Sequence, residues 1–322
     1  MRLRLVPKDT SFDFFKRWRL WLGISALLMV VAFGSFMVRG LNYGIDFRGG
    51  TTIRTQSPLP VDVGEYRGAI DALGLGDITI TEVFDPTFEA DQNVAMIRIQ
   101  AQDGQESVTS ALITSVESAL RAVQPDIQFI SVESVGPKVS GELIQTAFIA
   151  VGLAIGAVLI YIWLRFEWQF AVGAVAALIH DVILTIGVFS EIQIRFDLAI
   201  IAALLTIVGY SLNDTVVVFD RVRENLRKYK QKDLAQVLNL SINETLSRTV
   251  MTSVTTLLAL ISLFVLGGDV IRGFVFAMIW GVIVGTYSSV FVASSILLYL
   301  GVKRDWSKPD ANTGNQYANI DA

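Results

Sequence analysis

Cysteine is absent from this 322-residue sequence, and histidine occurs only once, at His180. These absences exclude a metal site built from several Cys or His ligands, and we predict neither a metal nor a cofactor. A Walker-type phosphate loop is also missing. The glycine-rich segment at 44–51, GIDFRGGT, precedes a strand pattern, so its glycines indicate a tight turn into that strand and not a dinucleotide loop. We therefore predict that the chain is not an enzyme.

Charged residues are also scarce, at 17% of the chain against 52% hydrophobic residues. A helix of about 20 apolar residues crosses the roughly 30 Å of hydrocarbon in a bilayer. Six runs are this long, at residues 20–38, 143–164, 168–190, 198–219, 249–268 and 273–300. We therefore predict an α-helical polytopic membrane protein with six transmembrane helices in contact with membrane lipid. The third run contains His180 and Asp181, and the fourth contains Asn213 and Asp214.

The distribution of Lys and Arg predicts the orientation of these helices. Basic residues gather in residues 1–19, before the first run, and in the segment 221–248, between the fourth and fifth runs. The positive-inside rule places both segments in the cytoplasm, and with six spans the tail at 303–322 lies there too. Residues 20–38 begin like a signal peptide, but no small-x-small cleavage site follows, so we interpret them as a retained anchor. Both termini of this multi-pass protein are thus expected in the cytoplasm.

The polar segment at 39–140 is the size of a small domain and is expected outside the cytoplasm, in the periplasm, before the remaining spans at 141–302. Within it, at 41–136, β-branched runs with a period of two alternate with runs of helical period in the order βαββαβ. That order is typical of an α+β ferredoxin-like domain. Residues 41–136 contain 14 acidic residues against 5 arginines, so binding to nucleic acid is not expected.

Five segments of the sequence carry a resemblance to a known family. They are NYGIDFRGGT after the first run, VGPKVSGEL before the second, ALIHDVILTIGVF in the third, VGYSLNDTVVVFDRVREN in the fourth and NETLSRTVMTSVTTLLALISLFVLGG in the fifth. In this order they resemble the SecF members of the SecD/SecF family of protein-export membrane proteins, which is part of the resistance-nodulation-division (RND) superfamily. The resemblance implies that the six helices form one RND-type half in the bacterial inner membrane.

The resemblance also implies a function and a set of partners. A SecF-like subunit works with SecD beside the SecYEG translocon and uses the proton motive force in the late, ATP-independent stage of preprotein translocation. SecD, SecYEG and unfolded preprotein clients are therefore the expected partners. By position in the motifs, the intramembrane acidic residue of the family is Asp214 and its partnering arginine is Arg248.

The residues around Asp214 support a proton site independently of the resemblance. On a helix, Thr206, Tyr210 and Asp214 form one polar stripe in an apolar surface, and Asn213 lies beside it. A carboxylate at the centre of a membrane helix costs about 2.5–3.5 kcal/mol on insertion scales, so it is by default a functional hypothesis. We predict a proton relay formed by Asp214, Arg248 and Asn213. Alternatively, Asp214 pairs with Arg248 or Asn213 only to hold helices together, although such contacts average about 0.6 kcal/mol.

Three further ionisable residues are interpreted from their positions. Asp220 lies at the basic edge of the fourth run, where a carboxylate is hydrated, and we expect no proton role for it. His180 and Asp181 fall near the middle of the third run. They either form a secondary proton relay or fix the packing of that helix against a partner helix, and both alternatives stay open.

Two other functional classes also stay open. An RND-type small-molecule exporter half would place an acidic residue in the fourth run as well, although such exporters carry two six-span halves in one chain. A passive translocon scaffold would need no titrating group. The small-xxx-small spacings Gly152/Gly156 and Gly281/Gly285 permit close helix approach and indicate an interface with SecD or the translocon.

Overall fold

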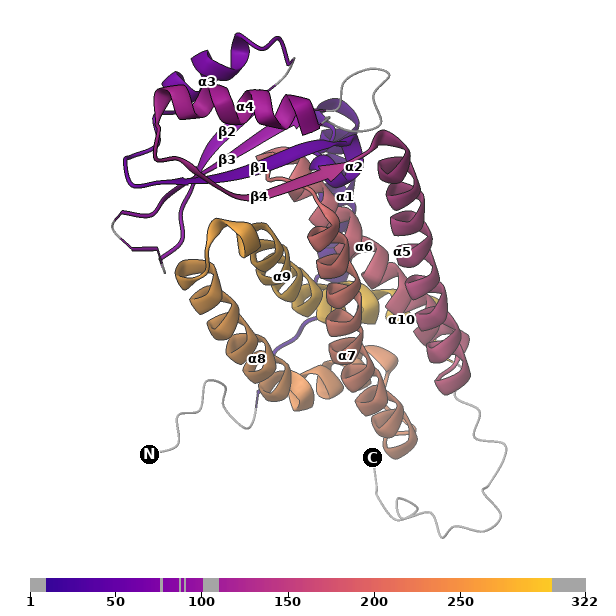
Figure 1. The fold of residues 1–322 in the computed structure, drawn as a ribbon. Helices are drawn as coiled ribbons and strands as arrows, with labels where there is room; N and C mark the ends of the chain where they lie inside the picture. The colour runs from indigo at the N-terminus through magenta and orange to yellow at the C-terminus, as the bar shows by residue number, and fades with distance from the viewer. Residues whose placement is uncertain (1–9, 76–77, 87, 90, 101–109, 303–322) are drawn as a thin grey trace, which may run out of the picture.

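The computed structural model describes residues 10–75, 78–86, 88–89, 91–100 and 110–302, so the ends of the expected cytoplasmic segments, at 1–9 and 303–322, lie outside the described residues. Six long apolar helical segments form a bundle, and an α+β domain lies over one end of it (Figure 1). The segments are α1 (Trp18–Arg39), α5 (Pro137–Arg165), α6 (Trp168–Ile192), α7 (Leu198–Lys228), α8 (Leu234–Leu266) and α9 (Asp269–Ser288), which continues through a π-helical turn (Ser289–Ala293) into α10 (Ser294–Leu300). Each segment is long and apolar enough to cross a membrane, as predicted.

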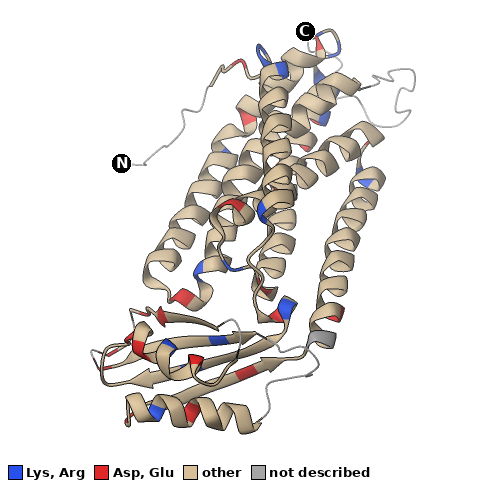
Figure 2. Cartoon of the chain, turned by 90° about the horizontal axis from the view of Figure 1, so that it is seen from above, with Lys and Arg blue, Asp and Glu red and all other residues tan. Residues whose placement is uncertain are grey.

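Charged residues gather at the two ends of the bundle and in the α+β domain, and few lie between them (Figure 2). At the end far from the domain, most of the basic segment 221–248 is helical, because α7 continues to Lys228 and α8 begins at Leu234. Arg221 joins these two helices by an ion pair with Glu244 at 2.6 Å. The connection between the fourth and fifth spans is therefore short.

The α+β domain follows α1 and precedes α5. Its elements are β1 (Gly50–Ser57), α3 (Val63–Asp71), β2 (Ile78–Val83), β3 (Asn93–Gln100), α4 (Ser110–Val123) and β4 (Gln128–Val135). The four strands form one antiparallel sheet in the order β2-β3-β1-β4, and α3 and α4 cover the face that points away from the bundle (Figure 1). The predicted βαββαβ ferredoxin-like order is thus confirmed.

The alternation of residues along the strands explains this two-layer arrangement. Ile53 of β1 and Ile97 of β3 are paired in register and fully buried under the helices, with Tyr66 of α3 and Leu120 of α4. Helix α3 begins at an Asp62 cap, whose carboxylate accepts the backbone N–H groups of residues 64 and 65 at 2.8 and 3.0 Å. The opposite face of the sheet, which carries the alternate residues, is directed at the helical bundle.

The glycine-rich segment before β1 contains a single helical turn, α2 (Ile45–Arg48), which was not predicted from the sequence. Gly49 and Gly50 follow it with φ angles of 73° and 137°, a region that other residues rarely adopt. These two glycines turn the chain from α2 into the strand, as expected from the sequence. A Cβ atom at Gly44 would lie 2.9 Å from the Arg195 side chain, so this glycine lets the α6–α7 connection pack on the turn.

Two sets of hydrogen bonds donated by backbone N–H groups attach the domain to the bundle in addition to the chain itself. Gly44 N–H donates to the Phe196 carbonyl and Phe196 N–H donates to the Asn42 carbonyl, both at 2.8 Å. On the other side, the Asp269 N–H donates to the Phe84 carbonyl at 3.0 Å, and the Phe84 N–H donates to Asp269 Oδ2 at 2.7 Å. The connection between β2 and β3 is thereby fixed to the start of α9.

The two glycine spacings noted in the sequence have different surroundings. The Gly281/Gly285 pair faces α7 inside the bundle, where a Cβ at Gly281 would overlap the Ile207 side chain. This pair therefore serves a contact within the chain, and the expectation of an interface with another subunit is wrong for it. At Gly152 and Gly156, in contrast, no described atom outside their own helix lies within 4 Å of an added Cβ.

Candidate functional site

Asp214 lies near the middle of α7 and is buried, with 4% of its surface exposed. Its Oδ2 atom has no hydrogen-bond partner in the described structure. The neighbouring helix α8 brings Arg248 and Thr249 next to the carboxyl group. A buried polar atom without a partner is costly, so each such atom in a native protein calls for an explanation.

The other two residues predicted for this site lie at the surface of the bundle. Arg248 is exposed on α8, and among the ion pairs of the described residues none within 4.0 Å joins it to Asp214. Asn213 is exposed on the outer face of α7, together with Thr206 and Gly209. The structure therefore brings Arg248 close to Asp214 without an ion pair, whereas Asn213 faces outward.

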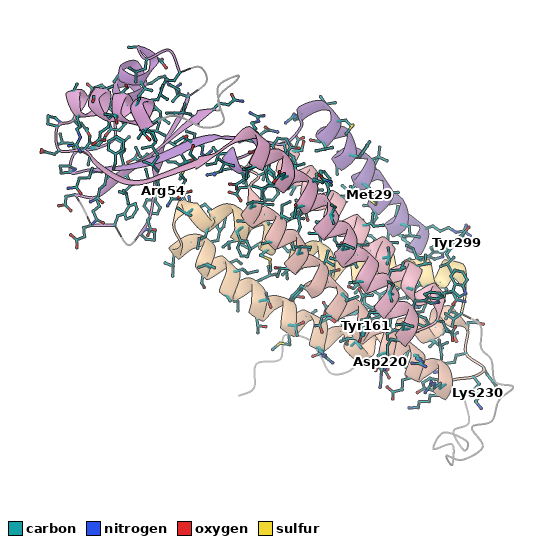
Figure 3. All side chains as sticks on the ribbon, turned by 45° about the vertical axis from the view of Figure 1, so that its right-hand side comes forward. Met29, Arg54, Tyr161, Asp220, Lys230 and Tyr299 are labelled. Atoms are coloured by element: carbon teal, nitrogen blue, oxygen red, sulfur yellow. The ribbon has the colours of Figure 1, made fainter. Side chains whose placement is uncertain are left out.

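Asp220, six residues after Asp214, lies in a different environment. It is exposed and pairs with Arg165 of α5 at 3.3 Å. Figure 3 shows it toward the end of the bundle that also carries Lys230. The carboxylate is thus at a polar edge of the bundle, as expected from its position in the sequence.

His180 and Asp181 form the second group of buried polar residues, at the centre of the bundle. Asp181 Oδ2 accepts hydrogen bonds from Ser211 Oγ of α7 at 2.6 Å and from Ser288 Oγ of α9 at 2.8 Å. Its Oδ1 lies 3.0 Å from Nδ1 of His180. None of these four side chains is more than 1% exposed. One carboxyl group thus joins the three helices α6, α7 and α9.

The imidazole of His180 extends this network towards α1. Its ring stacks on Tyr287, with centroids 6.0 Å apart and an interplanar angle of 29°. The Tyr287 hydroxyl lies 3.0 Å from Ser25 Oγ of α1. His180 Nε2 is buried and has no partner among the described residues. The arrangement is therefore able to hold a proton on the imidazole or on the carboxyl group, or simply to fix four helices together.

A π-helical turn connects this network with the helix that carries Asp214. The turn begins at Ser289, whose Oγ lies 2.8 Å from Thr215 Oγ1 of α7. Turns of this kind are rare and occur frequently at functional sites. Ser211 precedes Asp214 and Thr215 follows it, both within one helical turn. Helix α7 therefore carries Asp214 next to residues that belong to the Asp181 network.

Sequence reasoning missed the serine and threonine members of this network. The signal that was available is the run of small and hydroxyl residues at 285–295, GTYSSVFVASS, in an otherwise apolar helix. Among the described residues there is no group of three or more His, Asp or Glu side chains that could hold a metal ion. The polar chemistry of the bundle therefore rests on single carboxyl groups and one imidazole.

The fold and these buried groups define a multi-pass membrane protein with one α+β domain outside the spans. Two family models match the chain: the SecD/SecF protein-export membrane protein C-terminal family over residues 115–303, and the SecD/SecF GG motif over residues 34–57. The chain is 62% identical over 321 residues to a protein translocase subunit SecF of Cereibacter sphaeroides, covering 100% of this chain and 99% of that protein. It is 41% identical over 298 residues to a SecF of Vibrio alginolyticus, covering 92% of each.

The chain therefore belongs to the SecD/SecF family of protein-export membrane proteins, and its full-length similarity is to the SecF subunit. This confirms the resemblance seen in the motifs and the prediction of a transport component that is not an enzyme. The crystal structure of SecDF from Thermus thermophilus, a translocon-associated membrane protein, superposes with a TM-score of 0.80 at 35% identity over 93% of this chain. The match spans 40% of that longer chain.

Proposed function

We propose that this chain uses the proton motive force to promote the late, ATP-independent stage of preprotein translocation, and that Asp214 is its proton-carrying group. The supporting observation is a buried carboxyl group in a spanning helix, with one oxygen free of hydrogen bonds and Arg248 nearby but not ion-paired. A carboxyl group that only holds helices together, as in a passive scaffold, would be paired. One proton crossing the membrane yields about 2.3 kcal/mol per 100 mV, which can bias a conformational cycle.

In this proposal Arg248 controls when Asp214 holds a proton. Burial disfavours a charged carboxylate, whereas a nearby guanidinium favours it. Approach of Arg248 would therefore release the proton, and withdrawal would allow uptake. Because the Arg248 side chain is exposed and Asp214 is buried, a small shift of α8 against α7 is enough to change their separation. The arginine acts as a switch in this scheme and Asp214 as the carrier.

We further propose that SecD covers the exposed polar face of α7. This face carries Thr206, Gly209 and Asn213, and polar groups facing lipid within a span are costly. No described atom outside α7 lies within 4 Å of an added Cβ at Gly209, so a partner helix can approach closely there. The solved SecDF chain is longer than this one, which fits a second half supplied by another subunit.

The same proposal places SecYEG and unfolded preproteins as further partners, with the α+β domain in the periplasm and both termini in the cytoplasm of a bacterium. The support is the charge distribution. Basic side chains gather at the α7–α8 end of the bundle, and this end is cytoplasmic under the positive-inside rule. The domain lies at the opposite end.

His180 and Asp181 are proposed as a secondary relay. Both are buried, they lie in hydrogen-bond distance of each other, and Asp181 contacts Ser211, which is one turn from Asp214. Hydroxyl groups can pass protons because they both donate and accept hydrogen bonds. The alternative is that this network only fixes the helices.

The test is completion of preprotein translocation in membrane vesicles after ATP depletion, with and without a proton gradient. Asp214→Asn should remove the gradient-dependent part while the protein stays inserted and bound to SecD, and Arg248→Met should do much the same. Asp220→Asn is the matched control, because it changes a carboxylate of the same helix that is exposed and paired with Arg165. Full stimulation with Asp214→Asn at normal expression would refute the proton role and favour the scaffold.

A further inference from the structure

Three arginines meet between the sheet and the helical bundle. Arg54 of β1 and Arg98 of β3 are two residues apart in register, because Arg54 pairs with Met96 and Arg98 pairs with Thr52. Their side chains share the sheet face opposite to the one covered by α3 and α4. Figure 3 shows Arg54 on this bundle side of the sheet. Arg195 reaches the same place from the α6–α7 connection.

The three positive charges lie close together. Nη2 of Arg98 is 3.2 Å and Nη1 of Arg195 is 3.8 Å from the sulfur of Met96, the residue that pairs with Arg54. Burial, together with the charges of Arg195 and Arg54, lowers the pKa of Arg98 to about 10. The cluster is therefore an unfavourable arrangement of like charges in a partly buried place.

Only one of the three arginines has an ion pair among the described residues. Arg195 lies 3.6 Å from Asp197 Oδ2, but among the described ion pairs within 4.0 Å neither Arg54 nor Arg98 takes part. Asp197 also caps α7 by accepting the Ala199 N–H at 3.1 Å. Asp46 lies near Asp197, and Glu133 is exposed on the same sheet face opposite Thr52, but neither is within 4.0 Å of the three guanidinium groups. Within the described part of the chain, Arg54 and Arg98 therefore have no carboxylate in direct contact. An anion from outside the chain would stabilise the cluster.

Hydrogen-bond donors on the same face are also without partners. The Nε atoms of the three arginines are buried and form no hydrogen bond with a described group, although Arg195 Nε is ion-paired with Asp197 Oδ2 at 3.6 Å. The same holds for Thr52 Oγ1 and Ser131 Oγ, which lie on this sheet face opposite Arg98 and Arg54. A single buried donor without an acceptor is an occasional exception in native structures, but five around one place are not. A single ligand rich in acceptor atoms would satisfy all of them together.

We propose that this cluster of Thr52, Arg54, Arg98, Ser131 and Arg195 binds a phosphate-type oxyanion. A phosphate carries about one to two negative charges and several acceptor oxygens, which matches the two guanidinium groups that lack an ion pair and the number of donors. The donors come from three strands and a loop, and this spread suits a tetrahedral group better than a planar carboxylate. Arginine is also the preferred side chain for phosphate recognition.

Free phosphate and the headgroup of a phospholipid are two sources of this chemistry. The position is compatible with both: Arg195 follows the end of α6 by three residues, near the depth of lipid headgroups, and it also faces the domain. In either case the oxyanion would connect β1, β3 and β4 with the α6–α7 connection. It would thus hold the domain on the bundle.

Thermal unfolding of the full chain in detergent micelles tests the proposal directly. Phosphate should raise the Tm in a saturable way compared with chloride at equal ionic strength, or else nanodiscs containing phosphatidylglycerol should raise it compared with phosphatidylcholine alone. Arg98→Gln should weaken the affinity about tenfold or more, as expected for loss of a charged hydrogen bond. Arg121→Gln is the matched control, since Arg121 lies on α4 and pairs with Glu117.

Ser131→Ala provides a second variant in case Arg98→Gln impairs folding. Because the Ser131 hydroxyl has no partner in the described chain, its removal should leave the Tm without phosphate unchanged and still weaken binding severalfold. A rise with free phosphate identifies that source, and a rise only with the anionic lipid identifies the headgroup. The proposal is overturned if neither raises the Tm, if both variants respond like the wild-type chain, or if only an acidic peptide stabilises the protein.

Discussion

Replacing Gly187 by alanine tests how closely α1 packs on α6. A Cβ at Gly187 would lie 2.6 Å from Ala32 Cα and would overlap the Ala32 methyl group. Carbon atoms in contact are normally about 3.5–4.0 Å apart, so the two helices would have to separate by about 1 Å. Overpacking of this kind costs about 1–3 kcal/mol, while the higher helix propensity of alanine returns about 1 kcal/mol at most. With the full return counted, the net loss is about 0–2 kcal/mol, and the severe overlap with Ala32 places it towards the upper end.

The assay is unfolding in mixed micelles with increasing sodium dodecyl sulfate, followed by circular dichroism. Gly34→Ala is the matched control on α1, because no described atom outside that helix lies within 4 Å of its Cβ position, and it should not destabilise the chain. Adding Ala32→Gly to Gly187→Ala should restore only part of the loss, since the methyl overlap disappears while the backbone at position 32 stays too close to the new methyl group. If Gly187→Ala were as stable as Gly34→Ala, α1 would not lie at this distance from α6.

The other predictions concern α7, the buried network and the α+β domain. Gly209→Ala should leave the isolated chain stable but weaken its copurification with SecD. Because the chain contains no cysteine, Asn213→Cys gives a single crosslinking position, and it should crosslink to SecD. Labelling of this position only by lipid-soluble probes would contradict the prediction. Asp181→Asn should reduce gradient-dependent translocation while the protein still inserts into the membrane. If the proton gradient stimulated this variant as much as the wild type, the network around Asp181 would only pack the helices. Segment 41–136 should fold by itself, as circular dichroism can show. Burial raises the pKa of Tyr66 in this domain above its ordinary value of 10.0. The contribution of the neutral Tyr66 side chain to the free energy of unfolding is therefore present below pH 10 and is lost as the pH rises through the pKa of the folded state. Tyr66→Phe should remove this alkaline loss in urea titrations, at a cost of about 1–3 kcal/mol for the bond to Gln124.

Hydropathy and periodicity were sufficient to predict the six spans and the βαββαβ order. Both signals arise because an element is apolar on its buried face or, in a membrane, along its whole length. They can therefore be recognised in a single sequence. Asp214 could be identified because a carboxyl group is conspicuous in an apolar run. Its approach to Arg248 was taken from the family resemblance, and the orientation of Asn213 away from the carboxyl group was not foreseen.

The serine contacts of Asp181 and the arginine cluster could not be predicted in the same way. Ser211 and Ser288 are uncharged, and single serines are unremarkable in a span, so their common partner becomes evident only when three helices are placed together. Likewise, Arg98 and Arg195 are far apart in the sequence and meet only through the docking of the sheet. Gly281 shows a related limit, because a small-residue spacing indicates close approach without saying which helix approaches.

The hydrogen bonds between Phe84 and Asp269 have a mechanical consequence. They support the α+β domain at the start of α9, apart from its chain connections to α1 and α5 and its bonds to the α6–α7 connection. A body held at several separate points cannot rock over some of them without lifting from the others. A swing of the domain must therefore either break this support or tilt α9, the helix whose Ser288 holds Asp181. In the second case α9 would act as a lever, and a change at the Asp181 carboxyl group would displace the domain at the other end of the helix.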